Sequence, residues 1–223
     1  MSTFRLAVLG NSASFPPGDP LLGRASNAGD VLLVLGRVTS DALSALDSEG
    51  SRTVLVELGQ ESLGAITGEN FGREGGKVVG FARYRNGADE ASRVVELVVQ
   101  PQTDRDSIAA AVALFESAGL VPVISNDVPG RIIDRLIRPY FNRALTALDR
   151  GLATPDMLDK ALTLGLGFAR GPVAVLEKAG LVEHFKVCSA LHAALADPCY
   201  APPRRARVAA ILTGAAGDKG GCP

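Results

Sequence analysis

The amino-acid sequence predicts an α/β domain with a mostly parallel sheet, followed by an all-α domain. Short apolar runs alternate with helical stretches up to about residue 125, which is typical of strands joined by helical crossovers. After Pro129-Gly130 the apolar residues recur only at helical spacing. The length of 223 residues suits one large domain or two small ones, and these patterns favour two.

Six apolar or β-branched runs in the first half are predicted strands, and two segments between them are predicted helices. The strand runs are short and continuously apolar, as expected of strands buried on both faces. The longer helix repeats its apolar residues with a period near 3.6 and ends at Gly119. The predicted strands are 4–9, 31–35, 53–58, 77–84, 93–99 and 121–125, and the predicted helices are 40–48 and 104–118.

Four helices are predicted in the second half. The first carries a broad apolar stripe and contains Pro139, where a kink is expected. Thr154-Pro155-Asp156 supplies an N-cap, a first-turn proline and a first-turn acid, so it begins the second helix, which Gly165 and Gly167 end. Residues 214–223 are rich in glycine and are expected to be disordered. The predicted helices are 131–150, 154–165, 172–179 and 182–196.

Composition and charge narrow the class of protein. Hydrophobic residues make up 47% and charged residues 21% of the chain, and the net charge of −1 argues against a nucleic-acid binder. The apolar runs are far shorter than the roughly 20 residues of a membrane span, and the N-terminus lacks a signal-peptide layout. We therefore expect a cytoplasmic protein that binds neither nucleic acid nor a membrane. Three cysteines without CxxC spacing, and two histidines without ligands nearby, predict no metal site.

The two halves differ in charge. Residues 1–128 carry a net charge of −6 and residues 129–223 a net charge of +5. Either the halves attract each other within or between subunits, or the basic half meets a phosphorylated ligand, since Arg and Lys bind phosphate well. Arg131, Arg135 and Arg138 are expected along one helix flank and could serve either interaction.

Five segments of the helical half follow one another in a family-specific order. Val128-Pro129-Gly130-Arg131-Ile132-Ile133-Asp134-Arg135-Leu136 is the first, and it is similar to the motif Pro-Gly-Phe-x-x-Asn-Arg-Leu. Together the segments resemble the C-terminal domain of the 3-hydroxyacyl-CoA dehydrogenase family. Upstream, 94–98 and Pro101-Gln102-Thr103 resemble the end of that family's nucleotide-binding domain. The five segments are 128–136, 139–144, 151–161, 165–172 and 178–181.

The resemblance implies a truncated Rossmann-like domain at 1–127, a helical dimerisation domain at 128–206 and a flexible tail at 207–223. In the family, NAD binds to the first domain, the acyl-CoA lies between the domains, and a His–Glu pair acts on the 3-hydroxyl. Carried over by motif, Glu96 is the catalytic acid and Gly10 is the cofactor-binding residue. The same carry-over makes Ser62, Asp134 and Arg135 substrate-binding residues.

The sequence departs from the family where the cofactor would bind. Gly10 follows the first strand, but Ser12 and Phe15 take the next two glycine positions of the motif Gly-x-Gly-x-x-Gly. Only the 21 residues 10–30 separate the first two strands, too few for a helix–strand–helix–strand block. In the family pattern, 30–34 resemble the fourth strand. We therefore expect no cofactor, although the family uses NAD.

The catalytic positions differ as well. Ala82 stands where the family has its catalytic His, and a methyl group cannot act as a general base. Asp134 replaces a family Asn, and Arg138 four residues later offers it an ion pair. Glu96 is retained, either as an exposed or capped carboxylate at a strand edge or as a vestigial catalytic acid.

These departures lead to three hypotheses. The first is a family member that has lost its own NAD-dependent chemistry and serves CoA-thioester β-oxidation as a non-catalytic subunit, a dimerisation partner or an acyl-CoA-binding protein. It would form a homodimer, or a heterodimer with a complete dehydrogenase, through the helical domain.

The second is an active 3-hydroxyacyl-CoA dehydrogenase, or a subunit of one, that uses NAD bound by a partner chain. The third is a structural dimer module. A resemblance to the second half of two-repeat members from bacterial aromatic-acid degradation favours a partner role.

Overall fold

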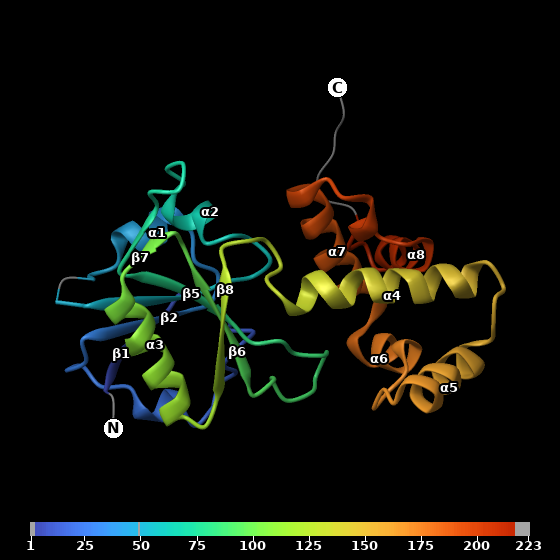
Figure 1. Ribbon diagram of the computed structural model, residues 1–223, viewed down its shortest axis with the longest axis horizontal. Helices are drawn as coiled ribbons and strands as arrows, with labels where there is room; N and C mark the ends of the chain where they lie inside the picture. The colour runs from blue at the N-terminus through green and yellow to red at the C-terminus, as the bar shows by residue number, and fades with distance from the viewer. Residues whose placement is uncertain (1–2, 49, 217–223) are drawn as a thin grey trace. The chain divides into compact units, whose positions relative to one another are not determined.

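The computed structural model describes residues 3–48 and 50–216, which form two compact units (Figure 1). The first unit contains the residues up to Arg85 and Glu90–Ile132, and we call the second, Asn86–Asp89 with the residues from Ile133 on, the helical unit. The first unit is α/β and the second is helical, so the predicted fold class is confirmed. None of the helices in the described ranges is long and apolar enough to cross a membrane.

A six-stranded sheet forms the centre of the first unit, with the strand order β1-β2-β3-β5-β6-β8. Neighbouring strands run parallel except for β5 and β6, which are antiparallel. All six strands coincide with predicted ones, and their ends differ by at most two residues. The strands are β1 (Phe4–Val8), β2 (Val31–Leu35), β3 (Thr53–Glu57), β5 (Val78–Ala82), β6 (Val94–Val99) and β8 (Val121–Asn126). A separate pair joins β4 (Gly75–Gly76) to β7 (Gln102–Thr103).

Helices cover both faces of this sheet, which explains why the central strands are apolar along their whole length. Alternate strand residues point to opposite faces. Leu33 and Leu55 pack in the cluster that contains α3 (Arg105–Ser117), while Val34 and Val56 pack in the cluster that contains side chains of α1 (Ser40–Ala45) and α2 (Gly64–Thr67). Helix α1 begins at the predicted residue but ends three residues early, and α2 has too few residues for its periodicity to be recognised.

The first strand lies at the edge of the sheet. In a complete dinucleotide-binding sheet the order is 3-2-1-4-5-6, so the first strand is central. Here every residue between β1 and β2 is described, and this segment contains only the 3-10 turn η1 (Leu22–Arg24). The truncated Rossmann-like sheet expected from the short spacing is therefore confirmed.

The helical unit contains the four predicted helices and one that was not predicted. Thr154 accepts a hydrogen bond from the Met157 N–H (3.4 Å) as the predicted N-cap. Gly165 lies inside α5, and Gly167 alone ends it in the left-handed conformation (φ 73°), which corrects the predicted double stop. The elements are α4 (Ile133–Asp149), α5 (Pro155–Leu166), α6 (Pro172–Ala179), α7 (Leu181–Leu195), η2 (Pro198–Tyr200) and α8 (Arg204–Leu212).

Helix α8 corrects the prediction of a tail from residue 207. Its small residues Ala206 and Ala210 are fully buried, and α8 packs against α7. Two alanines four residues apart on one face let the helices approach closely. Of the segment 214–223 expected to be disordered, residues 217–223 lie outside the described residues.

Helix α4 continues through Pro139 from Ile133 to Asp149. Proline has no N–H, so the Arg135 carbonyl loses its partner four residues later. The Tyr200 hydroxyl donates to this carbonyl instead (3.1 Å). A residue 65 positions away along the chain therefore satisfies the backbone group that the proline leaves open.

Candidate functional site

A buried carboxylate joins two loops at the carboxyl end of the sheet, the edge at which ligands bind in α/β folds. Glu57 is the last residue of β3 and is 4% exposed. Its Oε1 accepts from the Ser14 N–H (2.7 Å) and the Ser12 hydroxyl (2.9 Å), and its Oε2 accepts from the Gly36 N–H (2.7 Å). Glu57 thus holds the loops that follow β1 and β2.

Gly36 permits this arrangement because its backbone touches the loop after β1. A Cβ at Gly36 would lie 2.6 Å from the Gly10 nitrogen, and its φ of 91° disfavours any other residue. Gly10, the predicted cofactor-binding residue, is exposed next to this contact. The two glycines therefore serve the close approach of two loops.

Arg83 also holds the loop after β1. Its backbone N–H donates to the Ser14 hydroxyl (3.1 Å), and its guanidinium donates to the Ser14 carbonyl (2.9 Å) and to Asp19 (3.1 Å). The guanidinium also lies 4.8 Å from the centre of the Phe15 ring, a cation–π contact. The loop is thus anchored by β3 and by the residue that follows β5.

The loop after β1 does not by itself form the pyrophosphate site of the dinucleotide motif. That site needs a helix that begins after the first strand and free N–H groups pointing at the ligand. No α-helix begins between β1 and β2, a stretch that is described throughout, and the Ser14 and Gly36 N–H groups donate to Glu57.

Replacing Glu57 by glutamine is expected to lower the free energy of unfolding by about 2 kcal/mol, because hydrogen bonds to a charged acceptor contribute more than neutral ones. The amide group of glutamine would also face an N–H donor. Urea unfolding followed by far-ultraviolet circular dichroism measures the loss, with the exposed Glu116→Gln as the matched control. An unchanged midpoint for Glu57→Gln would show that the carboxylate does not hold these loops.

The structure brings the two predicted catalytic positions together on neighbouring strands. Glu96 on β6 is directly opposite Ala82 on β5 in the antiparallel register. Side chains opposite each other in such a pair have Cβ atoms roughly 5 Å apart. The pairing therefore agrees with the motif alignment that put Ala82 in the family's His position, and Ala82 supplies no proton-accepting group.

Glu96, interpreted from the sequence either as an exposed or capped strand-edge carboxylate or as a vestigial catalytic acid, is a buried, ion-paired carboxylate. It is 3% exposed, and its Oε1 accepts from the Ile132 N–H (2.7 Å). Its Oε2 lies 3.7 Å from Arg131 Nε. Arg131 was expected on a helix flank, but it precedes α4 in the left-handed conformation (φ 52°). Sequence reasoning missed this pair because its residues are far apart along the chain.

Ser62, a predicted substrate-binding residue, is half-buried before α2, where its hydroxyl accepts from the Ala65 N–H (3.3 Å). The Leu63 and Gly64 N–H groups donate to the Asp127 carboxylate at 2.6 and 2.7 Å. Asp127, which sequence reasoning did not single out, therefore caps α2 from the end of β8. In this arrangement Ser62 has a local capping contact.

Asp134, a second predicted substrate-binding residue, forms the expected ion pair with Arg138. Asp134 Oδ1 accepts from Arg138 Nε (2.7 Å), and the two side chains are 9% and 7% exposed. Arg135, the third, is half-buried, and its carbonyl accepts from Tyr200. Arg131 and Arg138 each pair with a carboxylate of their own unit, which corrects the expectation of one shared arginine flank.

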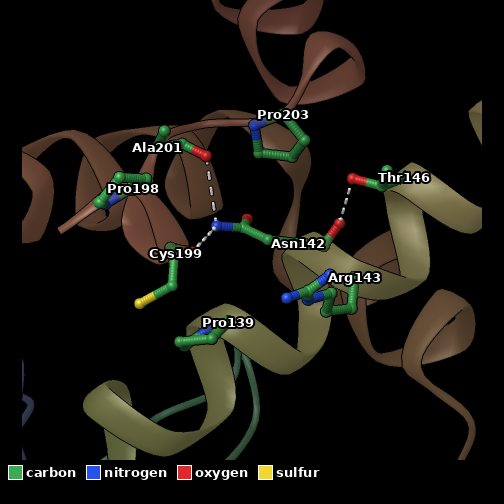
Figure 2. A pocket seen from close by; sticks show the side chains of 8 residues that line it. All are labelled: Pro139, Asn142, Arg143, Thr146, Pro198, Cys199, Ala201 and Pro203. Atoms are coloured by element: carbon green, nitrogen blue, oxygen red, sulfur yellow. Dashed lines mark hydrogen bonds between the residues drawn. The ribbon is translucent and has the colours of Figure 1, made fainter.

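A buried polar network extends from this ion pair into α7, and sequence reasoning did not identify it. Arg138 Nη1 lies 3.4 Å from His184 Nδ1, and His184 Nε2 lies 2.8 Å from Asn142 Oδ1. Because a guanidinium only donates, His184 Nδ1 must accept and Nε2–H must donate to Asn142. The Asn142 amide in turn donates to the Cys199 carbonyl (2.8 Å) and the Ala201 carbonyl (3.3 Å) (Figure 2).

The titratable members of this network are held in their neutral forms. Burial, with a smaller effect of the Arg138 charge, lowers the pKa of His184 to about 4. Burial raises the pKa of the Cys188 thiol to about 12. Neither group can serve as a base or nucleophile near neutral pH, so the network has a structural role. The spacing of Asp134, Arg138 and Asn142 at every fourth residue was the sequence signal for it.

Surface cavities line α4 in the described part of the helical unit. One of about 330 Å³ adjoins Asn142 and Cys199 (Figure 2), and one of about 430 Å³ lies between α4 and α5 and is almost wholly apolar. The second, which we call the α4–α5 groove, is lined by Tyr140, Arg143, Ala144, Leu152, Ala153, Met157, Leu158, Ala161 and Leu162.

The fold is that of the hydroxyacyl-CoA dehydrogenases. The crystal structure of (S)-3-hydroxybutyryl-CoA dehydrogenase from Ralstonia eutropha matches 86% of this chain and 71% of its own, with a TM-score of 0.71 and 23% sequence identity. Residues 130–221 match the model of the 3-hydroxyacyl-CoA dehydrogenase C-terminal domain. This part of the chain, residues 130–221, is therefore similar to the C-terminal domain of the 3-hydroxyacyl-CoA dehydrogenase family.

The matches to known relatives cover only part of each relative's length. The probable 3-hydroxybutyryl-CoA dehydrogenase of Bacillus subtilis is 30% identical over 110 residues, which are 49% of this chain and 38% of that protein. The mitochondrial hydroxyacyl-coenzyme A dehydrogenase of Sus scrofa is 35% identical over 89 residues, 40% of this chain and 28% of that protein. The matched segments thus span less than half of either relative.

The similarity to known proteins corrects one expectation. The sequence led us to expect no cofactor, but the proteins that this chain resembles are NAD-dependent dehydrogenases. The expectation rested on the altered glycine positions and the short spacing between the first two strands, and it was wrong. NAD therefore belongs to the chemistry of this family.

Proposed function

We propose that this chain is a companion subunit of a 3-hydroxyacyl-CoA dehydrogenase. It would pair through its helical unit with a complete dehydrogenase chain, and the complex would act on CoA thioesters with NAD bound by that complete chain. NAD would accept a hydride from the substrate there. This proposal combines the family's cofactor with the departures seen in this chain.

The observation that carries the proposal is the pair of residues Ala82 and Glu96. A general base must reach the substrate hydroxyl and accept its proton, which Ala82 cannot do. Both oxygens of the Glu96 carboxylate face groups of this chain, the Ile132 N–H and the Arg131 guanidinium. An isolated chain with this pair is not equipped for acid–base chemistry, whereas a partner with a complete pair would be.

The surface of the helical unit supports the pairing. Leu152 and Met157 line the α4–α5 groove and are 76% and 61% exposed. Leu164 and Leu166, which lie on α5 with Met157, are 77% and 66% exposed. Apolar surface concentrated on one element of a folded protein is typical of an interface. The groove is therefore the proposed contact for the complete dehydrogenase.

Replacing Leu152 and Met157 together by aspartate is expected to weaken the pairing by about 30-fold or more, since a central interface residue commonly contributes 2 kcal/mol or more. Co-expression of the tagged chain with a complete 3-hydroxyacyl-CoA dehydrogenase from the same genome, followed by sedimentation of the purified complex, measures it. Phe71→Asp, a fully exposed aromatic of the first unit, is the matched control.

The same preparation separates the proposal from its alternatives. We expect the tagged chain to co-purify with the complete dehydrogenase and to oxidise no 3-hydroxybutyryl-CoA by itself in the presence of NAD. Turnover by the isolated chain would instead establish an active dehydrogenase. A homodimer that neither pairs with the dehydrogenase nor turns over substrate would support the third hypothesis, a structural dimer module.

A further inference from the structure

A buried guanidinium next to Glu96 has hydrogen-bond donors for which the described residues offer no acceptor. Arg131 is 4% exposed, and among the described residues its Nε and Nη1 have no hydrogen-bond partner. Its distance of 3.7 Å to Glu96 exceeds the roughly 2.8 Å of a charge-assisted hydrogen bond. Buried donors are nearly always satisfied in native proteins, so this exception calls for an explanation.

The backbone of Arg131 is strained at the same place. Its φ of 52° lies in the left-handed region, which a residue with a Cβ seldom adopts. Residues held in such conformations cluster at binding sites, where the surrounding fold enforces them. Arg131 therefore combines an unfavourable backbone with an unfavourable side-chain environment, and both penalties fall on the residue beside Glu96.

Of the side chains Ala82, Glu96 and Arg131, only Arg131 has free donors for a ligand oxygen. Ala82, opposite Glu96, has neither a donor nor an acceptor in its side chain. Glu96 balances the single positive charge of the guanidinium, so an oxo oxygen can bind without an isolated buried charge, whereas a carboxylate would add one negative charge to the site. A guanidinium also presents several fixed N–H groups, and a second oxygen can bind while Glu96 keeps its place.

We propose that Arg131 binds an oxygen on the acyl chain of an acyl-CoA, an oxo group or a carboxylate, and makes this chain select such acyl groups over saturated ones. The proposal rests on the proposed function, which supplies acyl-CoA as the ligand class. Arg131 is then a specificity-determining residue. Its unused Nη1 hydrogens would be satisfied by the ligand oxygen.

Three CoA thioesters that differ at the third carbon of the acyl chain test whether this chain prefers oxygen-bearing acyl groups. Butyryl-CoA has a methylene at the third carbon of its acyl chain, acetoacetyl-CoA an oxo group, and malonyl-CoA a carboxylate. Isothermal titration of the full chain should give dissociation constants at least about ten-fold lower for acetoacetyl-CoA, malonyl-CoA or both than for butyryl-CoA, the size of one hydrogen bond from a charged donor. The ligand with the larger ratio distinguishes an oxo group from a carboxylate.

Arg131→Met should make the dissociation constants for the oxygen-bearing ligand and for butyryl-CoA equal. The affinity for butyryl-CoA should stay within about three-fold of that of the original chain. The exposed Arg105→Met is the matched control and should keep the ratio. Because each ratio is taken within one variant, a general loss of affinity cancels. If Arg131→Met fails to fold by circular dichroism, Arg131→Lys, which keeps the charge but not the fork of donors, should reduce the ratio several-fold.

The remaining outcomes overturn the proposal in distinguishable ways. Equal affinity for all three thioesters removes the selectivity but leaves the companion role, which the pairing experiment tests separately. A ratio that survives both Arg131 variants places the selectivity elsewhere in the chain. Absence of binding for all three thioesters overturns both the role of Arg131 and acyl-CoA as the ligand class.

Discussion

Replacing Arg138 by methionine is expected to lower the free energy of unfolding by about 3–5 kcal/mol, because removal of one partner leaves a buried charge without compensation. The two side chains of the Asp134–Arg138 pair are 9% and 7% exposed, and their polar atoms are 2.7 Å apart. Methionine keeps the aliphatic stem of the arginine, so the lost packing is small. Urea unfolding followed by circular dichroism is suitable, since the chain has no Trp for fluorescence.

The neighbouring Arg135→Met serves as the matched control, since Arg135 is half-buried on the same helix and contributes its carbonyl to the Tyr200 contact. Its substitution should change stability by less than about 1 kcal/mol. The double variant Asp134→Leu with Arg138→Met should recover much of the loss, because an apolar pair can replace a buried ion pair. Equal effects of Arg138→Met and Arg135→Met would contradict the burial of this pair.

Stability is also expected to fall by about 3 kcal/mol between pH 6.5 and pH 4 as a result of His184 alone, at 1.36 kcal/mol for each unit by which the pKa is lowered. The pKa of His184 is lowered from 6.5 in the unfolded chain to about 4 in the folded one, chiefly by burial and then by the Arg138 charge. Below pH 6.5 the unfolded chain therefore takes up a proton that the folded chain does not. The stabilisation is present above pH 6.5, is lost progressively as the pH falls from 6.5 to about 4, and is absent below that.

His184→Gln separates this effect from the titration of carboxylates. The carboxyl groups whose pKa values are lowered start from 3.8 or 4.5, so their contributions are lost at lower pH than that of His184. Between pH 5 and 6.5 the wild-type chain should lose about 2 kcal/mol and His184→Gln almost none. His192→Gln should behave like the wild type. Parallel curves for the wild type and His184→Gln would refute the assignment.

The candidate site shows how far motif alignment can reach. Ala82 and Glu96 were aligned with the family's His and Glu by motif, and the strand register then put them opposite each other. The alignment could not say what surrounds Glu96, because Ile132 is 36 residues away along the chain. The carboxylate was therefore found, but its two partners were not.

Contacts between distant segments were invisible to the sequence in the same way. Glu57 was predicted only as part of a strand, although it holds Ser14 and Gly36 at 2.7 Å. His184 was dismissed as a metal ligand, and its contacts to Arg138 and Asn142 bridge two helices. Such contacts depend on how helices and strands pack, which periodicity does not encode.

By itself the sequence determined the fold class, the six strands of the main sheet, six of the helices and the N-cap at Thr154, because periodicity and capping act over a few neighbouring residues. It also indicated the resemblance of the helical half to the C-terminal domain of the 3-hydroxyacyl-CoA dehydrogenases, through motifs that follow one another in the family's order. Only the tertiary structure decided that β1 is an edge strand, that α8 extends the helical unit, and that Glu57, Glu96 and His184 are buried with named partners. These features depend on burial and hydrogen bonding between segments far apart in the chain, and their energies arise only when those segments meet.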